Sequence, residues 1–237
     1  MNMLVHEVDQ YIHDMTNVND NAEVIIGAPS IYLQRLLDLK PKGIKIAAQD
    51  VSIHDKGAYT GEISAAMLHA MGVDAAIIGH SERRLYHHET DELIGLKVQQ
   101  CLSNGVIPIY CCGETLAQRQ ANDQEKVVEE QVLTALSALT AEQMTAVVIA
   151  YEPVWAIGTG VTASNDQAEE MHAFIRKCLE KQWNAEVAQS VRILYGGSVN
   201  PQNADGLFAC PNVDGGLVGG ASLKANDFMS IIISAAK

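Results

Sequence analysis

Glu152 is the residue whose surroundings most clearly suggest chemistry. It follows residues 146–150, a run of small and β-branched apolar side chains that is typical of a buried parallel strand. The carboxylate therefore stands at the C-terminal end of that strand. The next segment joins a proline, two large apolar side chains outside any strand or helix period, and two glycines that free the backbone: Pro153, Trp155, Ile157, Gly158 and Gly160. We interpret this arrangement as a base beside a flexible lid.

Two other interpretations apply to the same stretch. A glutamate at a strand end is usually a solvated terminus or a salt-bridge partner. Gly158, Gly160 and Ala163 also imitate the G-x-G-x-x-A fingerprint of dinucleotide-binding proteins. That fingerprint begins directly at the strand end, whereas residues 153–157 intervene here. We therefore set the dinucleotide interpretation aside.

Two glycine pairs follow consecutive expected strands. Gly196 and Gly197 precede Ser198 after one strand, and Gly219 and Gly220 follow the next and last strand. Taken singly, each pair is more simply a tight turn in which glycine permits a positive φ. Exposed backbone N–H groups in two consecutive units, with Ser198 as an added donor, instead indicate a phosphate site.

His80 directly follows an expected strand at 75–78. A lone histidine at a strand end is more often a satisfied structural residue than a catalyst, but this one would face Glu152 across the same mouth. A carboxylate base opposite an imidazole suits proton abstraction next to a carbonyl. We expect Glu82 to join supporting ion pairs. Cys111 is interpreted as a packed thiol near the base, because no basic neighbour in the sequence lowers its pKa.

The elements that must position these residues are repeated units of a short apolar strand, a turn and a helical pattern. The expected strands are 23–28, 44–49, 75–78, 106–111, 146–150, 192–195 and 215–218, and the clearest helices are 1–16, 64–71, 91–104, 125–139, 167–180 and 224–234. This alternation, without a linker or a break in composition, predicts one α/β domain over residues 1–237. The C-terminal ends of parallel strands point to one face, so the candidate residues should converge there.

Composition excludes several classes of function. The 237 residues carry 16 Lys and Arg against 29 Asp and Glu, a formal charge of −13 that argues against nucleic-acid and anionic-membrane binding. Five cysteines without a C-x-x-C pair suggest a reducing cytoplasm rather than a disulfide framework. The first 16 residues predict an amphipathic helix without signal-peptide features, and no apolar run approaches membrane-spanning length. Histidines 87 and 88 are adjacent and would point apart, so no metal site is expected.

Four segments together resemble the triosephosphate isomerase family: IGHSERR at 78–84, AYEPVWAIGTG at 150–160, YGGSV at 195–199 and LVGGASL at 217–223. The resemblance runs along the whole chain. It implies a TIM (β/α)8 barrel that interconverts dihydroxyacetone phosphate and D-glyceraldehyde 3-phosphate, in glycolysis and gluconeogenesis, without a cofactor or metal.

The resemblance also implies a role for each candidate residue. Glu152 would be the base, and His80 a neutral electrophile whose pKa is lowered by a helix N-terminus. Main-chain groups of Gly158, Ser198, Gly219 and Gly220 would hold the phosphate, with Glu82 and Cys111 as supporting residues. The lid, which would keep the enediolate from losing phosphate, would include Pro153, Val154, Trp155, Ala156, Ile157, Thr159 and Gly160. The loop at 49–62 would reach a second subunit, with Thr60 near the partner's site, so a homodimer is implied.

The chain departs from the family pattern at its beginning. The family's first strand ends in Asn-Trp-Lys-Met-Asn, and Met1 and Asn2 align with the end of that segment. We therefore expect a barrel of seven strands and eight helices in which the first strand, with its Asn and Lys, is missing. Weak or no turnover would follow. The alternatives are a weakly active or inactive phosphate-binding barrel, or another phosphosugar isomerase.

Overall fold

Strands and helices alternate along the chain, as the sequence predicts. The computed structural model describes residues 2–15, 21–158 and 162–237. Its strands are β1 (Val24–Ala28), β2 (Ile44–Ala48), β3 (Ala75–Ile78), β4 (Ile107–Cys112), β5 (Val148–Tyr151) and β6 (Arg192–Tyr195). Its α-helices are α1 (Val5–Asp14), α2 (Leu33–Leu39), α3 (Ala65–Met71), α4 (Ser81–Tyr86), α5 (Asp91–Ser103), α6 (Leu116–Gln120), α7 (Gln124–Leu136), α8 (Ala141–Met144), α9 (Asn165–Gln182), α10 (Ala185–Ser190), α11 (Ala204–Phe208) and α12 (Ala225–Ala235). Short 3-10 turns occupy η1 (Ser30–Tyr32), η2 (Val154–Ala156) and η3 (Gly220–Leu223).

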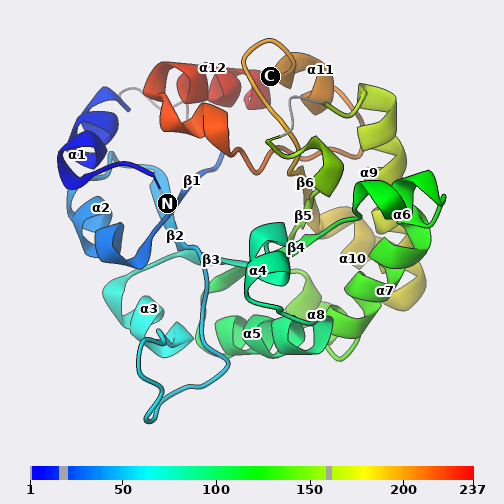
Figure 1. Ribbon diagram of the computed structural model, residues 1–237, viewed down its shortest axis with the longest axis horizontal. Coiled ribbons are helices and arrows are strands. Elements are labelled where there is room, and N and C mark those ends of the chain that lie inside the picture. Colours follow the sequence, from blue (N-terminus) through cyan, green and yellow to red (C-terminus); the bar gives the residue numbers. More distant parts are fainter. Residues whose placement is uncertain (1, 16–20, 159–161) are drawn as a thin grey trace.

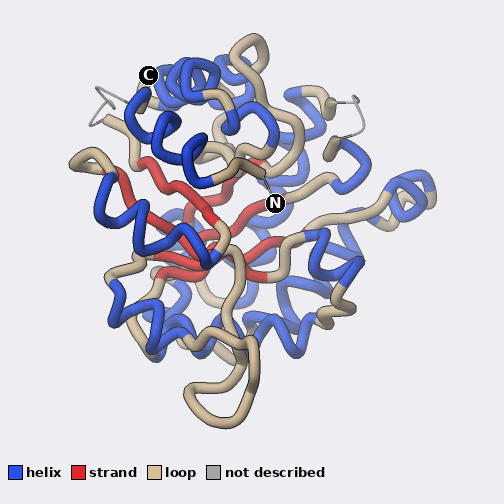
Figure 2. The backbone as a smooth tube through the Cα atoms, turned by 60° about the vertical axis from the view of Figure 1, so that its left-hand side comes forward, coloured by secondary structure: helices blue, strands red, loops and turns tan. Residues whose placement is uncertain are grey.

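The six strands form one parallel sheet in sequence order, from β1 to β6. Figure 1 shows this sheet curled into a half-barrel with the helices arranged around its outer face, and Figure 2 shows the strands enclosed by those helices. Glu23, just before β1, accepts hydrogen bonds from both Lys45 and Arg192. Because Arg192 begins β6, this contact brings the N-terminal ends of the first and last strands together. The parallel α/β architecture is thus confirmed.

Two numerical expectations are wrong. Residues 215–218 do not form a seventh strand; they contribute an isolated bridge in which Gly216 pairs with Tyr195. Gly215 has a φ of +146°, and two consecutive glycines offer no side chains to pack, so the ladder ends after two hydrogen bonds to Tyr195. The described residues also contain twelve α-helices rather than eight, because short helices such as α4 and α10 add turns within the connections.

The core has two parts, one on each face of the sheet. On the inner face, the buried side chains are Ala47, Ala75, Ile109, Cys111, Val148 and Ala150, and larger, partly buried side chains such as Ile77 and Leu194 pack against them. The outer face packs larger side chains, such as Ile46, Ile78 and Ile149, against the surrounding helices. Strands buried on both faces explain why the sequence shows continuous apolar runs instead of alternation.

Local signals fix where the helices begin. Ser64, Thr90, Thr115, Thr140, Ser164 and Asn184 each accept a backbone N–H at the start of a helix. At α9, Ser164 and Gln167 form a reciprocal capping box, which sets the helix start directly after the expected lid. Across the described ranges, no helix is both long and apolar enough to cross a membrane.

Candidate active site

Glu152 lies immediately after β5, with only 2% of its surface exposed. Its backbone N–H donates to the Cys112 carbonyl at 2.7 Å, which extends the pairing of β4 with β5. One carboxylate oxygen, Oε2, accepts the Ser81 N–H at 2.9 Å, and the other, Oε1, lies 2.9 Å from Nε2 of His80. The two residues that chemistry singles out from distant parts of the sequence are therefore in direct contact.

Two glycines make room for Glu152. A Cβ atom on Gly113 would lie 1.7 Å from the Glu152 carbonyl oxygen, and a Cβ on Gly196 would lie 2.9 Å from its Cγ atom. A side chain at Gly113 would require the backbone to move, and one at Gly196 would displace the Glu152 side chain. The sequence analysis assigned Gly196 to a phosphate turn and did not consider Gly113. Both glycines lie close to Glu152 only because neighbouring strands bring them there, and no local sequence pattern reveals that contact.

His80 is the N-cap residue of α4, and its side chain is 28% exposed. Its Nδ1 accepts the backbone N–H of Glu82 at 3.3 Å. An accepting Nδ1 carries no proton, so the neutral ring holds its proton on Nε2, the atom that faces Glu152. The helix start thus selects the tautomer that can donate a hydrogen bond into the site.

The pKa of His80 moves in the opposite direction from the one that the family resemblance implies. Burial lowers this pKa, but the hydrogen bond and the charge of Glu152, helped by the charge of Glu82, outweigh burial and raise it above its ordinary value. The cause is the direct contact with a carboxylate. A ligand that separates the two side chains would remove this influence.

The two supporting candidates differ in exposure. Glu82 has a side chain that is 73% exposed, with Oε2 3.9 Å from Nδ1 of His80, so it contributes a solvated charge. Cys111 is completely buried beside the base. Burial, followed by the negative charge of Glu152, raises the pKa of its thiol well above the usual range. The packed-thiol interpretation fits these surroundings, and a thiolate nucleophile does not.

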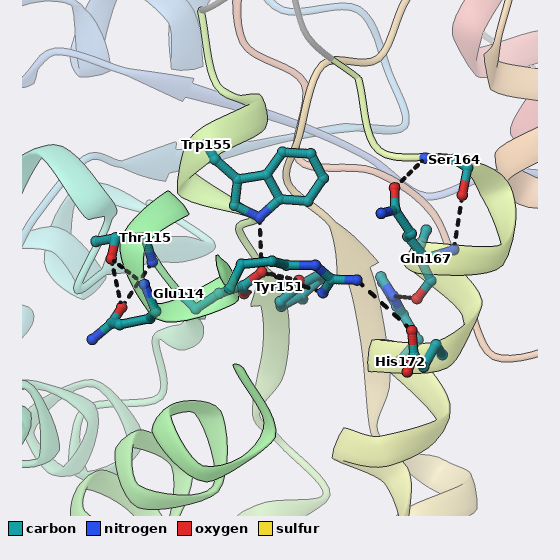
Figure 3. A network of polar contacts seen from close by, with 11 residues as sticks. Glu114, Thr115, Tyr151, Trp155, Ser164, Gln167 and His172 are labelled. Atoms are coloured by element: carbon teal, nitrogen blue, oxygen red, sulfur yellow. Dashed lines mark hydrogen bonds and ion pairs between the residues drawn. The ribbon is translucent and has the colours of Figure 1, made fainter. Parts of the chain in front are cut away.

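A buried carboxylate that the sequence analysis missed holds the start of the expected lid. Glu114 is fully buried and accepts hydrogen bonds from the Tyr151 hydroxyl at 2.9 Å and from Nε1 of Trp155 at 2.8 Å (Figure 3). Arg119 lies 3.5 Å from the same carboxylate, with its guanidinium 5.5 Å from the centre of the Trp155 ring. These contacts explain the tryptophan that no strand or helix period accounts for.

The rest of the expected lid is described in part. Pro153 is followed by η2, which contains Val154, Trp155 and Ala156, and the Val154 N–H donates to the Glu114 carbonyl at 3.0 Å. Ile157 ends this turn, and Gly158 adopts a φ of +65° that favours glycine. Thr159 and Gly160 lie outside the described residues.

The expected phosphate contacts have different surroundings. Both donors of Ser198, its N–H and its hydroxyl, bond the Ala156 carbonyl at 3.1 and 2.9 Å, so they join the two loops instead of facing solvent. Gly219 and Gly220 are exposed, and a Cβ atom on either would meet nothing within 4 Å. Their backbone is therefore accessible, whereas Ser198 must exchange one partner for another to bind an anion.

Thr60 lies far along an exposed loop. Figure 1 shows the segment between β2 and α3 projecting away from the body of the molecule. Within this segment, the rings of His54 and Tyr59 stack with their centres 3.6 Å apart, and residues 55–62 are exposed. The loop therefore has internal order without packing on the rest of the chain.

Together, the described contacts place an acceptor and a donor of protons side by side at the C-terminal end of a parallel sheet. Glu152 provides a carboxylate that is shielded from water on most sides, and His80 provides an Nε2 proton on a partly exposed ring. Such a pair can remove a proton from carbon while polarising an adjacent oxygen.

Comparisons with known proteins agree with this geometry. The family model described as triosephosphate isomerase matches residues 1–235. A triosephosphate isomerase from Chloroherpeton thalassium is 57% identical over 210 residues, covering 88% of this chain and 83% of the relative. Relatives of the same name from Acetivibrio thermocellus and Lactobacillus helveticus are 51% and 52% identical, each over 89% of this chain and 84% of the relative. The chain therefore belongs to the triosephosphate isomerase family.

Proposed function

We propose that this chain interconverts dihydroxyacetone phosphate and D-glyceraldehyde 3-phosphate by proton transfer through an enediolate. The observation that carries the proposal is the buried Glu152 carboxylate, held 2.9 Å from Nε2 of His80 in a member of this family. The reaction exchanges two hydrogen positions and leaves the oxidation level of the whole molecule unchanged, so it needs no redox cofactor.

The proposed mechanism begins when substrate separates the two side chains. Glu152 removes the proton on the carbon next to the carbonyl, and Nε2–H of His80 donates to the oxygen on which negative charge develops. The hydroxyl proton passes from one substrate oxygen to the other by way of Nε2 of His80, and the protonated Glu152 returns its proton to the neighbouring carbon. The tautomer fixed by the Glu82 N–H suits His80 for this step, because it presents a donor and not an acceptor.

The proposed phosphate site uses main-chain groups of Gly158, Ser198, Gly219 and Gly220. The accessible backbone at the last two glycines supports it, and Ser198 would release the Ala156 carbonyl when the anion binds. Residues 153–163 would act as the lid that excludes water and retains the phosphate. These roles make the phosphorylated triose, not a free sugar, the preferred ligand.

The wider assembly follows from the same family. We propose one domain over residues 1–237 with a (β/α)8 arrangement, in which a further parallel strand fits between β1 and the bridge at Gly216. The projecting loop with Thr60 supports a homodimer in which each loop reaches the other subunit, and we propose that this dimer works in the cytoplasm. Sedimentation at micromolar concentration tests the dimer, and a single monomer boundary would count against it.

A coupled assay with D-glyceraldehyde 3-phosphate tests the function. Glu152→Gln keeps the shape of the side chain but removes the base, so we expect turnover to fall by about 10² to 10⁴. Glu142→Gln, on the exposed surface of α8, is the matched control and should turn over like the wild type. Equal rates for the two variants would refute the assignment of Glu152.

A further inference from the structure

His172 is the buried histidine that the proposed mechanism leaves without a role. It lies on α9 with 0% of its surface exposed, in contact with two tyrosines of the sheet. Its ring meets Tyr151 edge-on, with the ring centres 5.6 Å apart, and lies tilted toward Tyr195 at 6.1 Å. Those two tyrosines are partners in the register of β5 and β6. The histidine therefore packs against the end of the strand that delivers Glu152.

A hydrogen bond joins the same ring to the beginning of α9. Nδ1 of His172 lies 2.6 Å from the Ala168 carbonyl oxygen, which can only accept, so Nδ1 must carry a proton. Burial is the largest influence on the pKa of His172 and lowers it, which favours the neutral ring. Ala168 belongs to the first turn after the Ser164 capping box, where the 153–163 loop returns to regular structure.

Tyr151 connects His172 to the N-terminal end of the same loop. The Tyr151 hydroxyl donates to Glu114, and Glu114 also accepts Nε1 of Trp155 (Figure 3). A continuous set of contacts thus runs from Ala168 through His172, Tyr151 and Glu114 to Trp155. It spans both ends of the loop by way of described residues only.

We infer that His172 is a positioning residue of the isomerase site, whose neutral ring holds the two ends of the 153–163 loop in fixed relation and thereby orients Glu152. This inference rests on the proposed function. The ring of His172 acts in two ways. Its edge contact fixes Tyr151, and its Nδ1 proton fixes the first turn of α9. A hydrophobic side chain of similar size could fill the space, but it could not do both.

The reaction offers a readout that simple loss of stability does not move. An enediolate that is not enclosed can expel its phosphate: the carbon–oxygen bond to the phosphate breaks, the phosphate leaves with the bonding electrons, and the remaining enol becomes an α-dicarbonyl compound. The ratio of inorganic phosphate released to triose isomerised therefore reports how well the loop encloses the intermediate. Once the phosphate released without enzyme is subtracted, partial unfolding lowers both products together and leaves the ratio unchanged.

Two variants separate the two contacts. His172→Phe keeps an aromatic ring but has no donor for Ala168, whereas His172→Asn keeps a donor but has no ring. Losing an interaction worth about 1 kcal/mol should raise the phosphate-to-isomer ratio about fivefold. Leu179→Ala, which makes a cavity two turns further along the buried side of α9, controls for lost stability and should keep the wild-type ratio. A rise in either histidine variant supports the inference, and wild-type ratios in both overturn it.

A second measurement does not depend on turnover. The chain has two tryptophans, and Trp183 donates to the Leu139 carbonyl at 2.9 Å, away from Glu114, so Trp183→Phe leaves Trp155 as the single tryptophan, which can be excited selectively over the tyrosines. In this background, His172→Phe should increase acrylamide quenching of Trp155 at least about twofold, as expected if roughly 0.5 kcal/mol of ordering is lost. Unchanged quenching overturns the inference. A wild type that forms neither product, combined with increased quenching, would instead refute the proposed function while showing that His172 still orders the ends of the 153–163 loop.

Discussion

At the residue scale, His80 is subject to opposing influences that a pH titration can separate. Burial lowers its pKa, and Glu152 with Glu82 raises it by a larger amount. A group whose pKa is raised on folding stabilises the folded state fully below its unfolded pKa, about 6.5 for histidine. That stabilisation is lost as the pH rises through the raised folded value.

The pH dependence of stability should therefore change when His80 is replaced. We expect the difference in free energy of unfolding between the wild type and His80→Gln to be largest near pH 6 and to shrink as the pH rises. Urea titrations at several pH values measure it, and His69→Gln, on an exposed helix, serves as the control. A difference that grows with pH would contradict the direction of the shift.

Residue types alone suggested Glu152 and His80, because a carboxylate and an imidazole after parallel strands must point to the same face. They did not suggest Glu114 or Gly113. A glutamate between a strand and a helix looks solvated in the sequence, and only the tertiary contacts with Tyr151 and Trp155 make it a buried acceptor. The direction of the shift in the His80 pKa could not be predicted either, because it depends on a 2.9 Å contact between residues that are 72 positions apart.

At the element scale, a buried group of charges holds α4, and with it the N-cap His80. Nζ of Lys97 on α5 lies 2.6 Å from Asp50 and 2.6 Å from Glu89, and both carboxylates also pair with Arg83 on α4. Lys97 and Glu89 are almost fully buried. Burial raises the pKa of Glu89, but Lys97 and then Arg83 outweigh it and lower that pKa overall.

Removing the lysine should be costly. Lys97→Met leaves two carboxylates with one cation, and breaking a buried pair in this way typically costs about 3–5 kcal/mol. Chemical denaturation at neutral pH measures the loss. The loss should shrink as the pH falls through the lowered pKa of Glu89, because the paired carboxylate then takes up a proton. Lys181→Met, which removes an exposed pair with Glu129, should cost under about 1 kcal/mol. Equal losses of unfolding free energy in the two variants would show that the buried charges stabilise the fold no more than the exposed pair does.

The elements themselves were predictable where patterns are long. Six strands and the helices at 91–104 and 167–180 carry apolar periodicity that local sequence reveals. Helices such as α6 and α8 are too short to show a period, and their start depends on caps at Thr115 and Thr140. The segment at 215–218 looks like a strand in its apolar residues, but the glycines at 215 and 216 loosen its backbone and the pairing stops at a single bridge.

At the scale of the whole molecule, the sheet has two ends that the described residues do not join by a strand. β1 is paired on one side only, and the far end consists of a single bridge at Gly216. Unpaired edges leave backbone donors and acceptors without partners and invite association. A strand placed in this gap would complete the ring of helices and strands seen in Figure 1.

A strand added beside β1 should raise activity, because it would pair the edge that the described residues leave open. We expect an added strand with a lysine at its C-terminal end to increase turnover by on the order of 10² to 10³, the usual effect of one preorganised donor at a developing negative charge. The same extension with methionine in place of the lysine separates the stabilisation of negative charge by the lysine from the effect of pairing the sheet edge. Identical rates for both extensions and the unextended chain would show that the gap does not limit catalysis.

Hydrogen exchange with solvent tests most directly whether Glu152 moves a proton from carbon. Dihydroxyacetone phosphate is incubated in D₂O with the wild type or with Glu152→Gln, and proton NMR follows the carbon-bound hydrogens. We expect the wild type to incorporate deuterium next to the carbonyl and the variant to do so more slowly by about 10² or more. Equal exchange in the two proteins, or none above the uncatalysed rate in the wild type, would contradict this expectation.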